Sequence, residues 1–171
     1  MTTLKTKATL SVAVALFFAA AIASCGDSSN KTSGNQTPNA EEKKLEEKVN
    51  EIKHYNTGIG PITKVEIGPF DAAMAAKGKS VYEMKCQSCH RIEGDRLVGP
   101  SFTGVTERRT PEWVMNMIMN TEAMLNEDQT AKDMLEICLV RMPNQNVAEP
   151  DARNIVEYFR EIDGHKKSWT E

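Results

Sequence analysis

The pentapeptide Cys86-Gln87-Ser88-Cys89-His90 carries the most specific pattern in this 171-residue chain. Two thiols separated by two residues and followed at once by an imidazole form the C-x-x-C-H pattern of covalent haem attachment. The spacing lets Cys86 and Cys89 add to the two vinyl groups on one edge of a haem, and it places the His90 ring below the iron. We therefore expect one covalently bound haem c.

Two other uses of a C-x-x-C pair fit the surrounding sequence less well. A thioredoxin-like redox pair follows a strand and opens a helix, whereas here a helical pattern precedes the motif and no sheet is predicted. A zinc site would need a fourth ligand from Cys138, His54 or His165, and the chain has no second paired knuckle to supply one. Haem attachment is the favoured interpretation.

The first 24 residues have the pattern of an export signal and are kept out of the fold. Lys5 and Lys7 give a basic start, and the uncharged stretch 10–23 is short for a membrane-spanning helix, which needs about 20 apolar residues. It ends in Ile22-Ala23-Ser24-Cys25, which resembles the lipobox of bacterial lipoproteins. We expect Cys25 to be lipidated and to anchor the protein on the periplasmic side of a bacterial membrane. An uncleaved signal anchor and a signal peptide with an incidental cysteine are the alternatives.

Residues 25–69 are predicted to be a tether and linker. Residues 26–40 are rich in Ser, Asn, Thr and Gly, have little to bury and indicate a flexible, disordered tether. Residues 41–54 are highly charged with a narrow apolar stripe, which predicts a short helix that is either a solvated spacer or a docking element. The Gly- and Pro-rich residues 58–69 indicate an extended segment leading into the domain.

From residue 70 the pattern becomes helical, so residues 70–164 are predicted to form one all-α domain, with a short tail at 165–171. Helices are expected at 71–85, from 111 onward, at 126–138 and at 150–163.

Two of these helices carry polar residues whose surroundings can be predicted from the helical pattern. In the helix that begins at Pro111, apolar residues surround nearly the whole circumference and leave Asn116 and Asn120 as the polar face, so it should be buried on several sides. In the last helix, Arg153 and Glu157 are expected to pair on the face opposite the apolar one.

Composition excludes some classes of partner. The net charge is −3, aromatic residues make up 6% and no basic patch is visible, so we expect no nucleic-acid binding. With Cys25 lipidated, three cysteines remain, and Cys138 lies among apolar residues, where a buried, small apolar role is expected.

Residues 71–163 resemble a class I cytochrome c. The similarity lies in Gly78 and Tyr82 of the first helix, the Cys86–His90 motif, Gly99-Pro100, and Met142-Pro143 before the last helix. The resemblance implies the cytochrome c fold, with its first and last helices crossing at Gly78. It also implies that the Pro100 carbonyl accepts a hydrogen bond from the His90 ring and so orients it.

The sixth iron ligand has several candidates, because the chain has nine methionines. Most of those after the motif lie on helical patterns, where methionine is usually core filler. Met142 lies in a loop, before Pro143, and matches the ligand position of the family. Met142 is therefore the predicted ligand, with Met134 next and His54 or His165 as remote alternatives.

His–Met ligation leaves no open iron site, which favours one-electron exchange over catalysis. Phe102, Trp113, Val114, Met117 and Ile118 are the expected apolar walls. We expect a monomeric electron carrier, not an enzyme, between a membrane quinol-oxidising complex and a periplasmic terminal reductase or oxidase, nitrous oxide reductase being one such reductase by analogy. The alternatives are a haem peroxidase or small-gas sensor with a labile sixth ligand, and a fixed electron-entry subunit of a larger complex.

Overall fold

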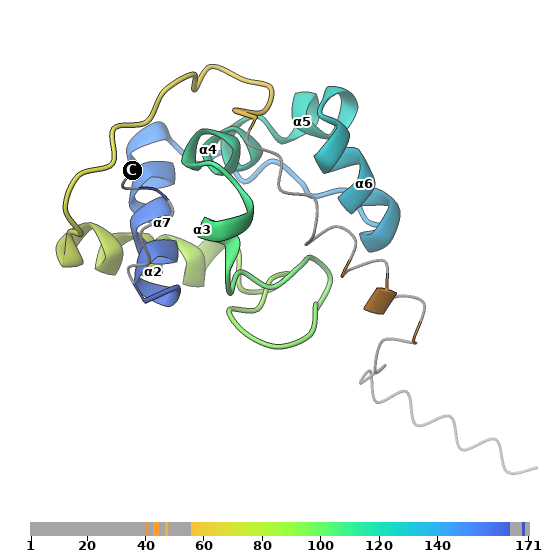
Figure 1. Cartoon of the computed structure of the whole chain (residues 1–171), viewed down its shortest axis with the longest axis horizontal. Helices are drawn as coiled ribbons and strands as arrows, with labels where there is room; N and C mark the ends of the chain where they lie inside the picture. Colours follow the sequence, from red (N-terminus) through yellow and green to blue (C-terminus); the bar gives the residue numbers. More distant parts are fainter. Residues whose placement is uncertain (1–39, 41–42, 45–46, 48–55, 165–168, 170–171) are drawn as a thin grey trace, which may run out of the picture. The chain divides into compact units, whose positions relative to one another are not determined.

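The computed structural model describes residues 40, 43–44, 47, 56–164 and 169. Within these residues every regular element is a helix (Figure 1), as the predicted all-α class requires. The helices are α2 (Ala72–Lys85), α3 (Val105–Arg108), α4 (Pro111–Met119), α5 (Thr121–Glu127), α6 (Gln129–Cys138) and α7 (Glu149–Ile162).

Most predictions for the N-terminal part of the chain lie outside the described residues. This applies to the export signal, to the lipidated Cys25 and to nearly all of the tether. Of the predicted charged helix, residues 43, 44 and 47 are described, and they are helical and exposed. In the described part of the chain, no helix is both long and apolar enough to span a bilayer.

Helices α2 and α7 cross each other (Figure 1), and their backbones come into contact at Gly78. Asp71 caps α2, because its carboxylate accepts hydrogen bonds from the backbone N–H groups of Ala73 and Met74. A Cβ atom on Gly78 would lie 2.0 Å from the carbonyl oxygen of Asn154 in α7, so only glycine lets the two backbones approach this closely. The packing role predicted for Gly78 is confirmed.

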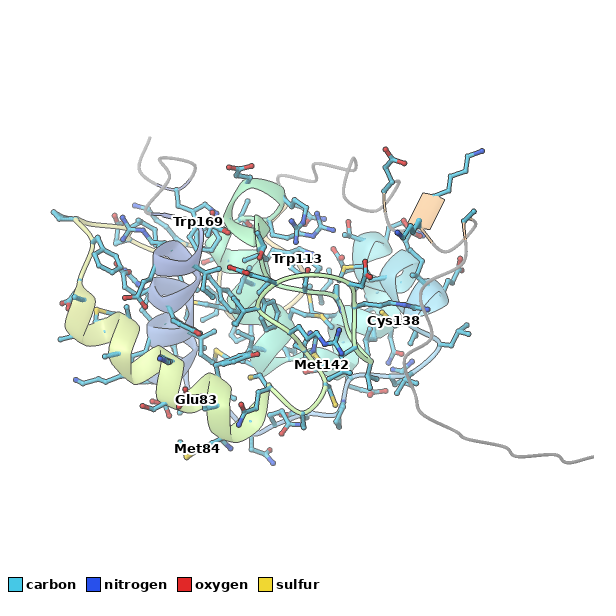
Figure 2. All side chains as sticks on the ribbon, turned by 90° about the horizontal axis from the view of Figure 1, so that it is seen from below. Glu83, Met84, Trp113, Cys138, Met142 and Trp169 are labelled. Atoms are coloured by element: carbon cyan, nitrogen blue, oxygen red, sulfur yellow. The ribbon has the colours of Figure 1, made fainter. Side chains whose placement is uncertain are left out.

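Aromatic rings connect the crossing helices to the segment that follows the haem motif. The ring centroid of Tyr82 in α2 lies 5.6 Å from that of Tyr158 in α7, and Phe102 lies 4.4 Å from Phe159. The opposite face of α2 is exposed, and Figure 2 shows Glu83 and Met84 on its outer side. The inner face of α2 is thus the one that supports the motif.

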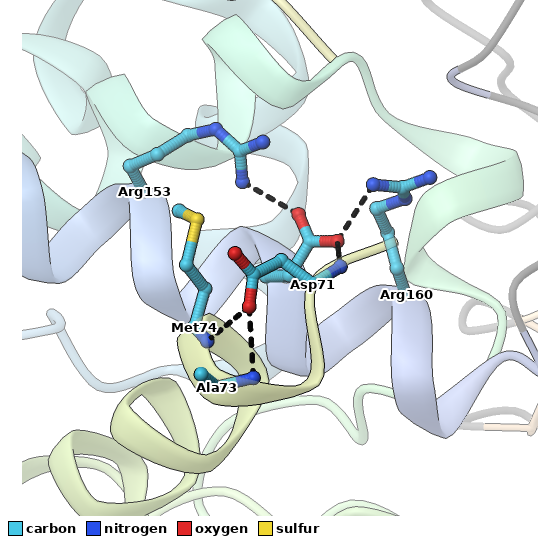
Figure 3. A network of polar contacts seen from close by, with 6 residues as sticks. Asp71, Ala73, Met74, Arg153 and Arg160 are labelled. Carbon is cyan, nitrogen blue, oxygen red and sulfur yellow. Dashed lines mark hydrogen bonds and ion pairs between the residues drawn. The ribbon is translucent and has the colours of Figure 1, made fainter. Parts of the chain in front are cut away.

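The predicted position of Glu157 on an outer face is wrong. Its pair with Arg153 exists, at 2.7 Å, but Glu157 is fully buried. Its carboxylate also accepts a hydrogen bond from Arg160, at 2.7 Å, and one from the backbone N–H of Asp71, at 2.9 Å (Figure 3). The start of α2 covers this face of α7, and helical periodicity within α7 gives no sign of that neighbour.

The helical region after residue 110 is divided differently from the prediction. Thr110 caps α4, as its hydroxyl accepts the N–H of Trp113. The helix expected at 126–138 is two elements, since Asn126 belongs to α5 and α6 begins after Asp128. The Asp128 carboxylate accepts the N–H of Ala131 and so starts a new helix at that point.

The extended segment before the domain is packed against α4. Its backbone from residue 56 to 65, which we name the strap, forms no helix or strand and is held by side chains of the α4–α6 region. Asn116, which is fully buried, and Asn120 both donate hydrogen bonds to strap carbonyl groups. The polar face predicted for α4 is therefore the surface against which the strap packs.

Candidate haem site

The haem motif continues from the end of α2. The N–H of Cys86 still bonds to the Tyr82 carbonyl in helical fashion, and the N–H groups of Cys89 and His90 both bond to the Cys86 carbonyl, at 3.1 and 2.9 Å. This tight turn brings Cys86, Cys89 and His90 to the wall of one cavity. Burial raises the pKa of the Cys86 thiol, opposed by Lys85 and reinforced by Cys89, so the sulfur is present as a thiol at neutral pH.

The His90 ring is held on three sides. Its Nδ1 lies 2.9 Å from the Pro100 carbonyl oxygen, the contact that the family resemblance implied. Phe102 stacks on the ring with a centroid distance of 4.7 Å and an interplanar angle of 12°. Gly99 lies against the ring edge, where a Cβ atom would be 2.3 Å from Cε1. An Nδ1–H that donates to Pro100 leaves the lone pair of Nε2 available for a metal.

Burial also favours metal binding by His90. It lowers the pKa of the imidazole below its ordinary value, although the Pro100 carbonyl acts in the opposite direction. A neutral imidazole is the form that coordinates iron. The loop is fixed around it, because Val98 and Gly99 donate N–H hydrogen bonds to the Cys89 carbonyl and the Tyr82 hydroxyl donates to the His90 carbonyl.

The cavity next to His90 is lined mainly by apolar side chains of the loops and of α4, α6 and α7. All five walls predicted from the sequence are among them: Phe102, Trp113, Val114, Met117 and Ile118. Further apolar lining comes from α6, with Ala131, Met134, Leu135 and Ile137, and from α7, with Ile155 and Phe159. A mainly apolar cavity beside two thiols and an imidazole suits a haem.

Three methionines reach this cavity, namely Met117, Met134 and Met142. Met117 lies on α4, and Met134 lies on α6 with its sulfur 3.7 Å from Nη2 of Arg109. Met142 is half-buried in the loop after α6, where no helix restricts its reach (Figure 2). Met124 instead packs under the strap, since its sulfur accepts the N–H of Ile59. The structure thus places both methionines considered as iron ligands, Met142 and Met134, at the site.

Five basic residues also line the cavity, and none of the described acidic residues does. They are Lys85, Arg96, Arg108, Arg109 and Arg141. The Arg109 side chain is buried over the Trp113 ring, 5.1 Å from its centroid. Burial, reinforced by Arg108 and opposed by Asp128, lowers the pKa of Arg109 to about 10, so it remains a cation at neutral pH.

The position of these basic residues at the cavity was not predicted from the sequence, although the adjacent Arg108-Arg109 pair lies directly before the helix that contains Trp113. Guanidinium groups at an apolar cavity suit carboxylates, and a haem carries two propionates. The residues at the cavity therefore fit a haem, with two thiols and an imidazole for its attachment and the buried guanidinium of Arg109 for a propionate.

Cys138 was predicted to be a buried, small apolar residue, and the structure shows it only half-buried. It lies at the end of α6 (Figure 2) and lines the cavity. The described residues include no group of three or more His, Cys, Asp or Glu side chains arranged to hold a metal ion. The zinc alternative therefore gains no support there, while His54 and His165 lie outside the described residues.

Comparison with known proteins agrees with this site. The family model for cytochrome c matches residues 75–163. A cytochrome c-553-like protein of Synechocystis sp. is 30% identical over 46 residues, which cover 27% of this chain and 44% of that relative, so less than half of its length is matched. Cytochrome c from Rhodothermus marinus has a TM-score of 0.60 at 31% identity over 63% of this chain and 92% of its own. An engineered form of it, bound to a carbene intermediate, has a TM-score of 0.56 at 31% identity over 61% and 91%.

Proposed function

The chain belongs to the cytochrome c family, and on that premise we propose that it carries single electrons by means of one covalent haem c, ligated by His90 and Met142. The observation that carries this proposal is that, in the described part of the chain, Met142 lines the same apolar cavity as all three reactive side chains of the motif. When bound, the haem supplies the one-electron exchange. His90, fixed by Pro100 and Phe102, holds the proximal side in one orientation.

The side chains around the cavity tune that exchange. A thioether sulfur from Met142 favours ferrous iron more than a second imidazole would. The apolar walls on α4 and α6 exclude water and disfavour the extra positive charge of ferric iron, which raises the potential further. Arg109, buried beside Trp113, would offset the negative charge of a haem propionate.

An exposed apolar patch at the cavity rim supplies a docking face for redox partners. It consists of Leu97, Val98, Leu139 and Val140. Leu139 is 82% exposed and has a left-handed backbone with φ of 58°, which is costly for a leucine in solvent. Arg96 ties the two halves of the patch together by donating to the Ile137 carbonyl. Basic residues beside the patch fit a partner with an acidic rim around an apolar centre.

The physiological setting completes the proposal. A lipid on Cys25 would hold the domain on the periplasmic side of a bacterial membrane, and a tether formed by residues 26–40 would let it move between partners. The donor would be a quinol-oxidising complex and the acceptor a terminal reductase or oxidase, with nitrous oxide reductase as one candidate by analogy. A monomer serves this role, and no catalytic turnover of its own is required.

A haem enzyme or small-gas sensor is the second candidate function. The observation in its favour is that the engineered Rhodothermus marinus cytochrome c, which shares this fold, is bound to a carbene intermediate. A similar reaction here would need the sixth position to open, and therefore a mobile Met142. A fixed electron-entry subunit is a third arrangement, which residues 41–54 would suit.

The optical spectrum separates these functions. For an electron carrier, the ferric wild-type protein shows the iron–thioether charge-transfer band and the ferrous protein resists carbon monoxide. Met142→Ala should lose the band and bind carbon monoxide readily. A wild-type protein that already lacks the band, or already binds carbon monoxide, would contradict the carrier proposal and favour the enzyme or sensor.

A further inference from the structure

Helix α4 has two occupied faces. Trp113, Val114 and Met117 line the haem cavity on one of them. On the other, Glu112 and Asn116 hold the strap. Because both faces belong to one nine-residue helix, a change in how the strap sits is transmitted to the cavity wall.

Asn116 forms the centre of this attachment. Its side-chain oxygen accepts the N–H of Ile62 at 3.0 Å, and its Nδ2 donates to the carbonyl groups of Ile62 and Thr57, both at 2.8 Å. The amide thus pairs with both backbone groups of Ile62, as a neighbouring strand would. The side chain is fully buried, so no water is at hand to replace these bonds.

Neighbouring side chains complete the attachment along the strap. Glu112 accepts the N–H of Val65 at 2.8 Å, and Asn120 donates to the Ile59 carbonyl at 3.1 Å. At the start of the strap, Thr110 donates to the Asn56 carbonyl at 2.8 Å. The strap has no regular secondary structure, so these side chains satisfy backbone groups that would otherwise be unpaired.

We infer that Asn116 is a positioning residue for the haem, which it serves by clamping the strap onto α4 and so keeping the cavity wall closed to water. The inference rests on the proposed haem function. With the clamp intact, α4 stays packed and the iron environment stays apolar, which keeps the potential high. With the clamp broken, α4 opens locally more often, water enters and the potential falls.

Two substitutions in the full chain break the clamp from opposite sides. Gly60→Ala places a Cβ atom 2.3 Å from Oδ1 of Asn116 and pushes the strap away. Asn116→Asp removes both donated hydrogen bonds and sets a negative charge against two carbonyl groups. The matched controls are Gly68→Ala, where a Cβ meets nothing within 4 Å, and Gln129→Glu, which adds a negative charge at an exposed residue of α6 that does not line the cavity.

Amide hydrogen exchange in α4 and the midpoint potential of the haem are then measured on the same proteins. Exchange at residues 113–118 should rise about tenfold or more in both clamp variants, and the potential should fall. Combining the two substitutions should add little, because each already releases the strap. The controls should match wild type in both measurements.

Two results would overturn the inference. One is a folded Gly60→Ala protein with wild-type exchange in α4 and a wild-type potential. The other is a lowered potential without faster exchange, which would mean that Asn116 does not act through α4. If Asn116→Asp does not fold, Gly60→Ala decides alone. If the wild type shows no His–Met spectrum, the proposed carrier function fails, while the exchange data still decide whether the clamp holds α4.

Discussion

Gly99 and His90 are in direct contact, and a Cβ atom on Gly99 would lie 2.3 Å from Cε1 of the imidazole. The Pro100 carbonyl holds the same ring at Nδ1, 2.9 Å away. Two consecutive residues thus determine the position of the His90 ring, which we propose as an iron ligand, one by leaving space and the other by accepting a hydrogen bond.

Gly99→Ala should therefore displace the His90 ring and impair haem binding. Either the loop must shift, which weakens the bond to Pro100, or the ring must tilt away from the iron. We expect several-fold less covalent haem per protein, measured by absorbance after purification. The fraction of the variant that does carry haem should have a lower midpoint potential. Gly68→Ala, in open space, is the control. Full haem loading with an unchanged potential would show that the contact does not constrain the ring.

Gly78→Ala should destabilise the fold by loosening the crossing of α2 and α7. The added Cβ would lie 2.0 Å from the Asn154 carbonyl oxygen, so the helices must separate. Alanine would gain about 1 kcal/mol in helix propensity, but overpacking this close to backbone costs about 2–3 kcal/mol, the upper part of the usual range, and spoils the aromatic contacts nearby. Chemical denaturation should show a net loss of about 1–2 kcal/mol, and equal or greater stability would contradict the close crossing.

Replacing Met134 and replacing Met142, the two candidate iron ligands, should affect the ferric charge-transfer band differently. Met134 lies beside Arg109, 3.7 Å from sulfur to Nη2, whereas Met142 is on a loop. Met134→Leu should keep the ferric charge-transfer band, and Met142→Leu should abolish it. Magnetic circular dichroism of the two variants tests this directly. The opposite pattern would make Met134 the ligand.

Local signals predicted much of the site. The spacing of Cys86, Cys89 and His90, the helix that precedes them and the apolar pattern around Trp113 were enough to predict the haem motif and its walls. The break between α5 and α6 was also within reach, because Asp128 is a typical helix-capping residue three positions before Ala131.

Contacts between distant residues could not be predicted in this way. Ile62 in the strap is 54 positions away from Asn116 in the chain, and neither segment's sequence indicates that it contacts the other. Helical periodicity showed that Asn116 shares a polar face with Asn120, but a polar face can meet water or a backbone equally well. Glu157 illustrates the same limit, since it is buried by the first residue before α2, 86 positions away.

Glu157 gives the fold a pH-dependent contribution to stability. Burial alone would raise the pKa of this carboxyl, but hydrogen bonds from Arg153, the Asp71 backbone and Arg160 outweigh burial, so its pKa lies below the ordinary value of 4.5. A depressed pKa means that the contribution is fully present above about pH 4.5 and is lost as pH falls through the lower, folded-state value.

Replacing Glu157 with Gln should show this dependence. The change leaves two arginines near Asp71 without their buried carboxylate, which should cost about 3 kcal/mol at pH 7. The difference in unfolding free energy between wild type and Glu157→Gln, from urea titrations at a series of pH values, should stay constant down to about pH 4.5. Below that it should shrink, because the wild-type carboxyl also becomes neutral. Glu83→Gln, at the exposed Lys79–Glu83 pair, should change stability by less than about 0.5 kcal/mol at any pH. If the difference in unfolding free energy between wild type and Glu157→Gln does not decrease below about pH 4.5, the buried charge is not what stabilises the junction of α2 and α7.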